Sequence, residues 1–186
     1  MICRAVTTLV VLLLTVQTPF NASADKPLTG DDLVKVQIAT MLVSEEDRNF
    51  VLVLKPEQTS VSMPGTADAR LVLPLVIGLE EGRSINVAFH KIGTPRPLSH
   101  DLMKMIIEEY GGSVASVVIT KMERETFFAE LRLKRAGREF IIDCRPSDAI
   151  GLALRSNAPV FVRRDVLTRH GVDPANPDKS DKPIKT

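Results

Sequence analysis

The sequence is poor in aromatic residues, with no Trp, one Tyr and seven Phe among 186 residues. Proteins that hold single-stranded nucleic acid by stacking bases on aromatic rings need more of them, so this mode of binding is disfavoured. The sequence also lacks an excess of charge of either sign, because it has 24 Lys and Arg residues and 23 Asp and Glu residues. This balance argues against a whole-protein electrostatic footprint for nucleic acid, although it leaves room for a local basic groove.

Long hydrophobic runs are missing as well. The apolar run at residues 6–16 has 11 residues, whereas a transmembrane helix needs about 20. It follows Arg4 and precedes Ala22-Ser23-Ala24, an order that is typical of a secretory signal peptide. We therefore expect residues 1–24 to be a cleaved signal and the protein to be periplasmic or secreted, without stable membrane insertion. An uncleaved anchor is the alternative.

Cysteine is scarce, and several well-known motifs are absent. Cys3 lies in the predicted signal, so Cys144 would be alone in the mature chain and could form neither an intrachain disulfide nor a Cys-based zinc site. The chain has no GxGxxG, GxxxxGK[ST], GxSxG or HExxH sequence. Nucleotide-binding, serine-hydrolase and zincin classes therefore lack their signatures.

The residues that are present predict an α+β fold, with a mostly antiparallel sheet packed by two to four helices, because predicted strands run together and helices interrupt in blocks. Pro74 places its strand at an edge or a bulge, and Ala136-Gly137 predicts a hairpin turn. We expect one domain at residues 25–170 and a disordered tail at 171–186. The predicted strands are 33–43, 50–54, 71–77, 114–121, 126–134, 138–144 and 159–162; the predicted helices are 80–92, 99–110, 147–155 and 163–170.

Two short segments of the chain look alike. Arg96-Pro97 precedes Ser99-His100-Asp101, and Arg145-Pro146 precedes Ser147-Asp148. In each segment we expect the Ser to cap a helix and the Asp to lie in its first turn. A helix N-terminus presents free N–H groups and a partial positive charge, and the neighbouring Arg adds further donors. Each segment is therefore suited to a phosphate or a carboxylate.

Carboxylates are expected to gather at the same place. Asp143 and Asp148 flank one loop, and we expect Glu81 and Asp101 to approach it. Three or four carboxylates around one pocket predict a Mg²⁺ or Mn²⁺ site, and such an ion stabilises charge on a phosphoryl group and makes a hydroxide from bound water. His100 is the candidate general acid or base, since an unperturbed His titrates near pH ~6.5.

These residues also have a purely structural interpretation. The helix dipole alone favours Asp in a first turn, and Ser99 and Ser147 are sufficiently explained as caps. Arg96 and Arg145 would then pair with the nearby carboxylates and lock two loops together, as ion-pair networks do. The residue spacing leaves both interpretations open.

Around these motifs the sequence resembles the bifunctional nuclease family, a small domain found in many bacteria. The resemblance covers about residues 33–167, and its most specific parts are the RPLxHDL and RPSDAI runs. Gly82 departs from the family, which usually has a helix-former such as Ala there. The matching stretches are LPLVIGLEEGRSI (73–85), PRPLSHDL (95–102), DCRPSDAIGLALR (143–155) and APVFV (158–162).

The resemblance implies an α+β fold, homo-oligomers, and cleavage of both DNA and RNA. We therefore expect an exported, metal-dependent phosphodiesterase. The alternative is a non-enzymatic oligomeric envelope protein that binds an anionic ligand or a protein partner. For the enzyme, the expected catalytic residues are His100, Asp101, Asp143 and Asp148; the expected substrate-binding residues are Arg96, Arg145 and Ser147; the expected metal ligands are Asp101, Asp143 and Asp148, with Glu81 in support.

Overall fold

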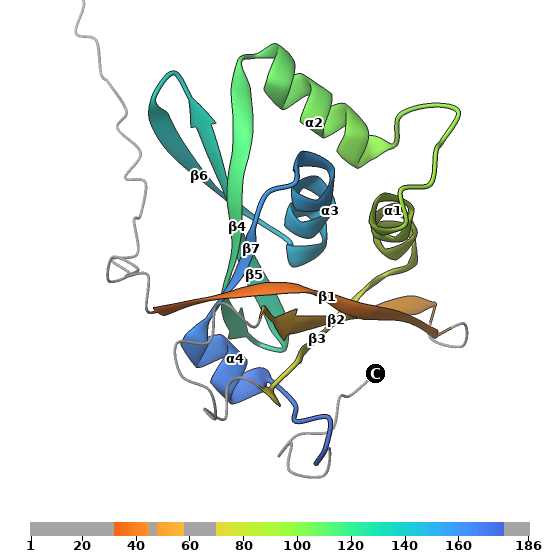
Figure 1. Ribbon diagram of the computed structural model, residues 1–186, viewed down its shortest axis with the longest axis vertical. Helices are drawn as coiled ribbons and strands as arrows, with labels where there is room; N and C mark the ends of the chain where they lie inside the picture. Colours follow the sequence, from red (N-terminus) through yellow and green to blue (C-terminus); the bar gives the residue numbers. More distant parts are fainter. Residues whose placement is uncertain (1–31, 45–47, 58–69, 177–186) are drawn as a thin grey trace, which may run out of the picture.

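A computed structural model describes residues 32–44, 48–57 and 70–176 (Figure 1). The predicted signal at 1–24, most of the loop after the second strand and the end of the tail lie outside the described residues. The elements in chain order are β1 (Leu33–Ser44), β2 (Asn49–Pro56), β3 (Leu73–Gly78), α1 (Leu79–Phe89), α2 (Ser99–Glu109), β4 (Gly112–Glu123), β5 (Thr126–Arg135), β6 (Arg138–Cys144), α3 (Pro146–Ser156), β7 (Val160–Arg163) and α4 (Arg164–His170).

The seven strands form one curled sheet in the order β3-β2-β1-β7-β4-β5-β6. Each neighbouring pair is antiparallel except β4 and β7, which run parallel. A parallel pair needs a long crossover, and here β5, β6 and α3 lie between the two strands in the chain. The predicted α+β class with a mostly antiparallel sheet is confirmed.

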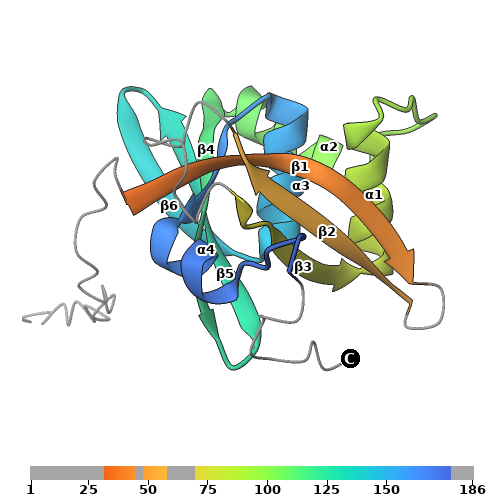
Figure 2. The same cartoon turned by 60° about the horizontal axis from the view of Figure 1, so that its bottom comes forward.

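Helices cover both sides of the sheet. In Figures 1 and 2, α1, α2 and α3 lie together on one side and α4 lies on the other. Val117, Val118 and Ile119 are consecutive in β4, and all three are fully buried. Successive residues of a strand point to opposite faces, so this run is buried because both faces of β4 are covered at that point.

The predicted turn and edge features are confirmed. Ala136 and Gly137 have φ of 48° and 75°, which is the left-handed geometry of a tight hairpin turn. Pro74 lies in β3, at the edge of the sheet, where a missing N–H costs no interior ladder bond. The chain continues in order beyond the predicted domain end at residue 170, since Val172 exchanges backbone hydrogen bonds with Val72.

The two predicted serine caps are wrong. The N-cap residues are Leu98 for α2 and Arg145 for α3, and neither uses a side-chain cap bond. The carboxylate of Asp101 accepts the Leu98 N–H at 2.9 Å, so the acidic residue in the first turn satisfies the helix start. Pro146 opens α3, which shifts Ser147 into the helix, where it is buried. A proline is well suited to that first position because it lacks the N–H that would remain unpaired there.

Helix α2 turns its apolar stripe away from the core. It packs on the rest of the domain through His100 and Ile107. The stripe that the sequence predicted for this helix is exposed, and so are both faces of the edge strand β6. The exposed residues are Leu102, Met105, Ile106 and Tyr110 on α2, and Phe140, Ile141 and Ile142 on β6.

None of the helices in the described part of the chain is both long and apolar enough to cross a membrane.

Candidate functional site

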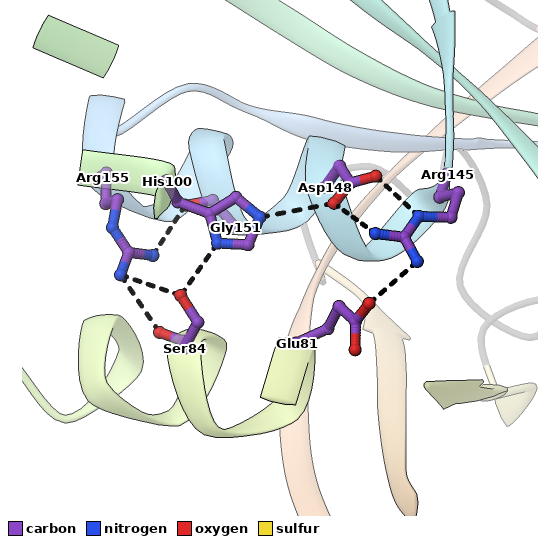
Figure 3. A network of polar contacts seen from close by, with 7 residues as sticks. All are labelled: Glu81, Ser84, His100, Arg145, Asp148, Gly151 and Arg155. Atoms are coloured by element: carbon purple, nitrogen blue, oxygen red, sulfur yellow. Dashed lines mark hydrogen bonds and ion pairs between the residues drawn. The ribbon is translucent and has the colours of Figure 1, made fainter. Parts of the chain in front are cut away.

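Three helices bring a network of polar side chains together beside the sheet (Figure 3). Helix α1 contributes Glu81 and Ser84 from one face, since they are three residues apart. Helix α2 contributes its first turn, and α3 contributes a face that runs from its N-cap to its last turn. Segments that are distant in the sequence therefore meet at one place.

Arg145 joins two of these helices. Its Nε donates to Oδ2 of Asp148 at 2.8 Å and its Nη2 donates to Oδ1 at 3.0 Å, while its Nη1 donates to Glu81 Oε1 at 2.8 Å. The hydrogen bonds to Asp148 and then to Glu81 raise the pKa of Arg145 above its usual value. The side chain is nevertheless 65% exposed. Three of the five guanidinium N–H groups are used, so two remain outside these bonds.

His100 lies beneath this ion pair and is only 4% exposed. Its Nδ1 is 2.8 Å from Ser84 Oγ, and its Nε2 is 3.6 Å from Asp148 Oδ1. Nε2 is buried and has no hydrogen-bond partner among the described residues. A Cβ added at Gly151 would come within 2.8 Å of the ring, so α3 approaches the histidine closely because it has a glycine there.

The environment of His100 lowers the pKa of its ring. Burial lowers its pKa below the usual value, and the charge of Arg155 lowers it further, while the Asp148 carboxylate opposes both effects in part. Desolvation disfavours the charged form of a buried group. Burial among these groups therefore favours the uncharged ring.

A second ion pair, between Arg155 and Asp101, joins the network on its buried side. Arg155, whose side chain is 6% exposed, donates from Nε to Asp101 Oδ1 at 2.6 Å. It also donates to the carbonyl oxygens of Gly151 and Ser84 and to Ser84 Oγ. Burial raises the pKa of Asp101, but the hydrogen bonds from Arg155 and the Leu98 N–H outweigh burial and lower it overall. This pair clamps α2 to α3 and α1.

The structure brings together Glu81, His100, Arg145 and Asp148 from the predicted site, with Asp101 tied to the same helices through Arg155. The other three predicted residues are elsewhere in the described structure. Arg96 is exposed in the loop before α2, Asp143 is exposed on β6, and Ser147 is buried in the first turn of α3; no hydrogen bond or ion pair found in the described residues joins them to the network.

The carboxylates are engaged by arginine rather than gathered around a cavity. Arg145 holds Glu81 and Asp148, and Arg155 holds Asp101. In the described residues, no group of three or more His, Cys, Asp and Glu side chains is arranged to hold a metal ion. The arrangement seen does not fit the predicted four-carboxylate set, and the metal site stays a prediction.

Ser84, Gly151 and Arg155 belong to the network, and the sequence-based candidates did not include them. A usable signal existed, since Asp148, Gly151 and Arg155 recur at helical spacing and so share one face of α3. Ser84 follows Glu81 by one turn of α1 in the same way. Extending the candidate motif along both helices by this period finds all three.

Two pockets in the described structure lie away from the network. One is lined by Val43, Arg48, Phe50, Leu79 and Arg83, and the other by residues of β1 and of the C-terminal part of α3. Neither includes Arg145 or Asp148. The network is thus a surface site whose accessible centre is a guanidinium group.

Fold and site together define an α+β domain with a cluster of arginine, carboxylate and histidine side chains between α1, α2 and α3. This cluster is suited to contact with an anionic group. The chain belongs to the bifunctional nuclease domain family, whose model matches residues 65–175. That range includes every residue of the network.

Individual relatives differ in how much of their length is matched. An uncharacterized protein of Mycobacterium tuberculosis is 32% identical over 136 residues, which cover 73% of this chain and 80% of that protein. Bifunctional nuclease 1 of Oryza sativa is 29% identical over 62% of this chain and 36% of its own length. Bifunctional nuclease 1 of Arabidopsis thaliana is 29% identical over 55% of this chain and 32% of its own length. The chain thus spans about a third of these plant relatives.

Proposed function

We propose that this protein hydrolyses phosphodiester bonds in DNA and RNA at the network centred on Arg145 and Asp148. The observation that supports this most is the convergence of the family's motif residues from three separate segments onto one accessible cluster. Plant members of the family are named bifunctional nucleases.

Arg145 is the proposed phosphate-binding group. Two of its N–H groups lie outside its three ion-pair bonds, and most of the side chain is exposed. A guanidinium can bind phosphate through two parallel hydrogen bonds. It would therefore engage a phosphodiester while Asp148 and Glu81 keep its orientation fixed.

Asp148 is the proposed general base beside that phosphate. It would accept a proton from the water that attacks phosphorus while the P–O bond to the leaving oxygen breaks, and that oxygen would take a proton from solvent. Asp148 is partly exposed, and both of its carboxylate oxygens are oriented by the guanidinium. His100 lies behind it, away from solvent. Proton transfer by a group positioned in this way contributes roughly 10²–10⁴-fold to a rate.

Metal dependence and export are separate parts of the proposal. Removing divalent ions with EDTA tests directly whether cleavage needs a metal. Export would place the substrate in the periplasm or the medium. Sequencing the N-terminus of the protein recovered from its producing cells tests the cleavage expected after Ala24.

A second candidate is favoured by one observation, namely that both arginines of the network are already paired with carboxylates. In that case the ion pairs are structural clamps, and the protein is an oligomeric module that binds an anionic ligand or a protein partner. The exposed apolar residues of α2 and β6 support homo-oligomers under either candidate.

Cleavage assays with site variants separate the two candidates. Plasmid DNA and unstructured RNA are incubated with the wild type, Arg145→Ala and Asp148→Asn, each with and without EDTA. We expect the cleavage rates of Arg145→Ala and Asp148→Asn to fall about a hundredfold, the usual effect of removing a group that stabilises transition-state charge. Glu125→Gln is the matched control, because Glu125 is an exposed carboxylate in the turn between β4 and β5, outside the network.

Loss of cleavage in both network variants, with the control unchanged, supports the nuclease. Equal cleavage in all folded samples contradicts the assignment of the site, and no cleavage by the folded wild type with Mg²⁺ or Mn²⁺ favours the binding module. Circular dichroism establishes that each sample is folded.

A further inference from the structure

Ser84 contacts two buried side chains of the network, His100 and Arg155. It lies on α1, with its hydroxyl 2.8 Å from Nδ1 of His100 and 3.2 Å from Nη2 of Arg155. The hydroxyl is therefore the link between the buried histidine and the buried arginine. The direction of its hydrogen decides how the histidine ring is protonated.

The hydrogen atoms around Ser84 can be assigned from their donors. A guanidinium only donates, so Ser84 Oγ accepts from Arg155. Its own hydrogen is then available for Nδ1 of His100. A neutral imidazole that accepts at Nδ1 carries its proton on Nε2.

The other side of the ring favours the same form. Nε2 faces Oδ1 of Asp148 at 3.6 Å, and that oxygen already accepts from Arg145. A proton on Nε2 points toward the carboxylate, whereas a lone pair there would face a negative oxygen in a buried site. The ring approaches α3 closely at Gly151, since an added Cβ there would come within 2.8 Å of Nε2.

We propose that Ser84 is a positioning residue, which holds His100 as the Nε2–H tautomer directed at Asp148. The effect on turnover rests on the proposed nuclease function. In this form Nε2 already carries its proton, so His100 is not the base of the resting site. Its Nε2–H faces the carboxylate of Asp148, which remains the proton acceptor of the network.

Histidine NMR tests the assignment without reference to activity. The chain has three histidines, so the full-length protein labelled with ¹⁵N at histidine gives few signals, and His100→Gln identifies the one of interest. Long-range ¹H–¹⁵N spectra near neutral pH distinguish the two tautomers. The same samples are assayed for cleavage of DNA and RNA.

We expect His100 to be the Nε2–H form in the wild type. Ser84→Ala should move its signal toward the other tautomer and lower the cleavage rate roughly tenfold, as small losses of alignment do. Ser84→Thr keeps the hydroxyl, so its His100 tautomer and its cleavage rate should match those of the wild type. Ser113→Ala, at an exposed position of β4, is the control and should change neither.

A wild-type signal of the Nδ1–H form overturns the inference. If folded Ser84→Ala has the same His100 tautomer and the same cleavage rate as the wild type, the positioning role is overturned. If Ser84→Ala does not fold, the wild type and Ser84→Thr still decide the tautomer. If the wild type cleaves neither nucleic acid, the proposed function fails, whereas the spectrum still decides which nitrogen carries the proton.

Discussion

His100 is the residue whose surroundings differ most from what the sequence suggested. The range in which a histidine titrates made it the candidate general acid or base, and the structure buries it under Asp148 and against Gly151. Periodicity shows which residues share a helix face, but it does not show how closely another helix approaches that face. A glycine on α3 decides this approach, because any larger residue would displace the ring.

Burial of His100 predicts a specific pH dependence of stability. Its pKa is lower in the folded protein than the unfolded value of 6.5, chiefly because burial penalises the charged ring. The unfolded state then binds more protons below that pH, so the free energy of unfolding falls as the pH drops below about 6.5. Melting temperatures between neutral and mildly acidic pH measure this effect.

The matched comparison is His100→Gln, which removes the titrating ring. Its melting temperature should fall less steeply over the same interval. Asp101 also has a lowered pKa, but its stabilising effect is lost only in more acid solution, below its ordinary value of 3.8. Parallel curves for wild type and variant would contradict the argument.

At the scale of elements, the boundaries of helices and strands follow from local pattern. The alternating and apolar runs appear as strands, and the hairpin turn at Ala136-Gly137 has the geometry expected from its residues. The helix starts do not follow the expected chemistry, since Asp101 and Pro146 replace the serine caps. Several local solutions satisfy a helix start equally well, so the pattern alone could not choose among them.

Gly82 in α1 illustrates how packing overrides helix propensity. An added Cβ there would collide with the ring of Phe50, and its distance to the Phe50 Cβ would be only 2.8 Å. Replacing Gly by Ala in a helix contributes about 1 kcal/mol, whereas overpacking a core costs about 1–3 kcal/mol. We expect Gly82→Ala to lower the free energy of unfolding by about 1 kcal/mol, measured by urea denaturation.

Gly93→Ala is the control for this experiment, because an added Cβ would meet nothing within 4 Å. Its stability should remain within about 0.5 kcal/mol of the wild type, as is usual for surface changes. If Gly82→Ala is more stable than the wild type, the Phe50 ring moves aside at little cost and the overpacking argument is contradicted.

At the scale of the whole molecule, the notable feature is an apolar surface without cover. In Figure 1, α2 and the β5–β6 hairpin lie toward the same end of the molecule. Exposed Ile106 and Phe140 represent this surface, because Phe140 is paired with Leu133 and so lies on the face of the sheet that α2 covers. The surface also includes the β6 edge of the sheet. Such patches and edges mark interaction sites in soluble proteins.

If copies of this chain associate through that surface, charge placed on it should separate them. We expect the wild type to sediment as an oligomer and Ile106→Glu/Phe140→Lys to sediment as a monomer. Val76→Lys is the control, since Val76 is equally exposed but lies on the opposite edge strand β3. Dissociation by the control alone, or a monomeric wild type, would contradict this interface.

The sequence by itself determined the α+β class, the order of the elements and the segments that carry the motif residues, because these depend on local periodicity and turn chemistry. Only the tertiary structure decided that Asp148 joins Arg145 and Glu81 while Asp143 stays outside. The direction of a side chain at a strand end or helix start depends on which neighbour packs there. That choice is made by contacts between α1, α2 and α3, which are distant in the chain.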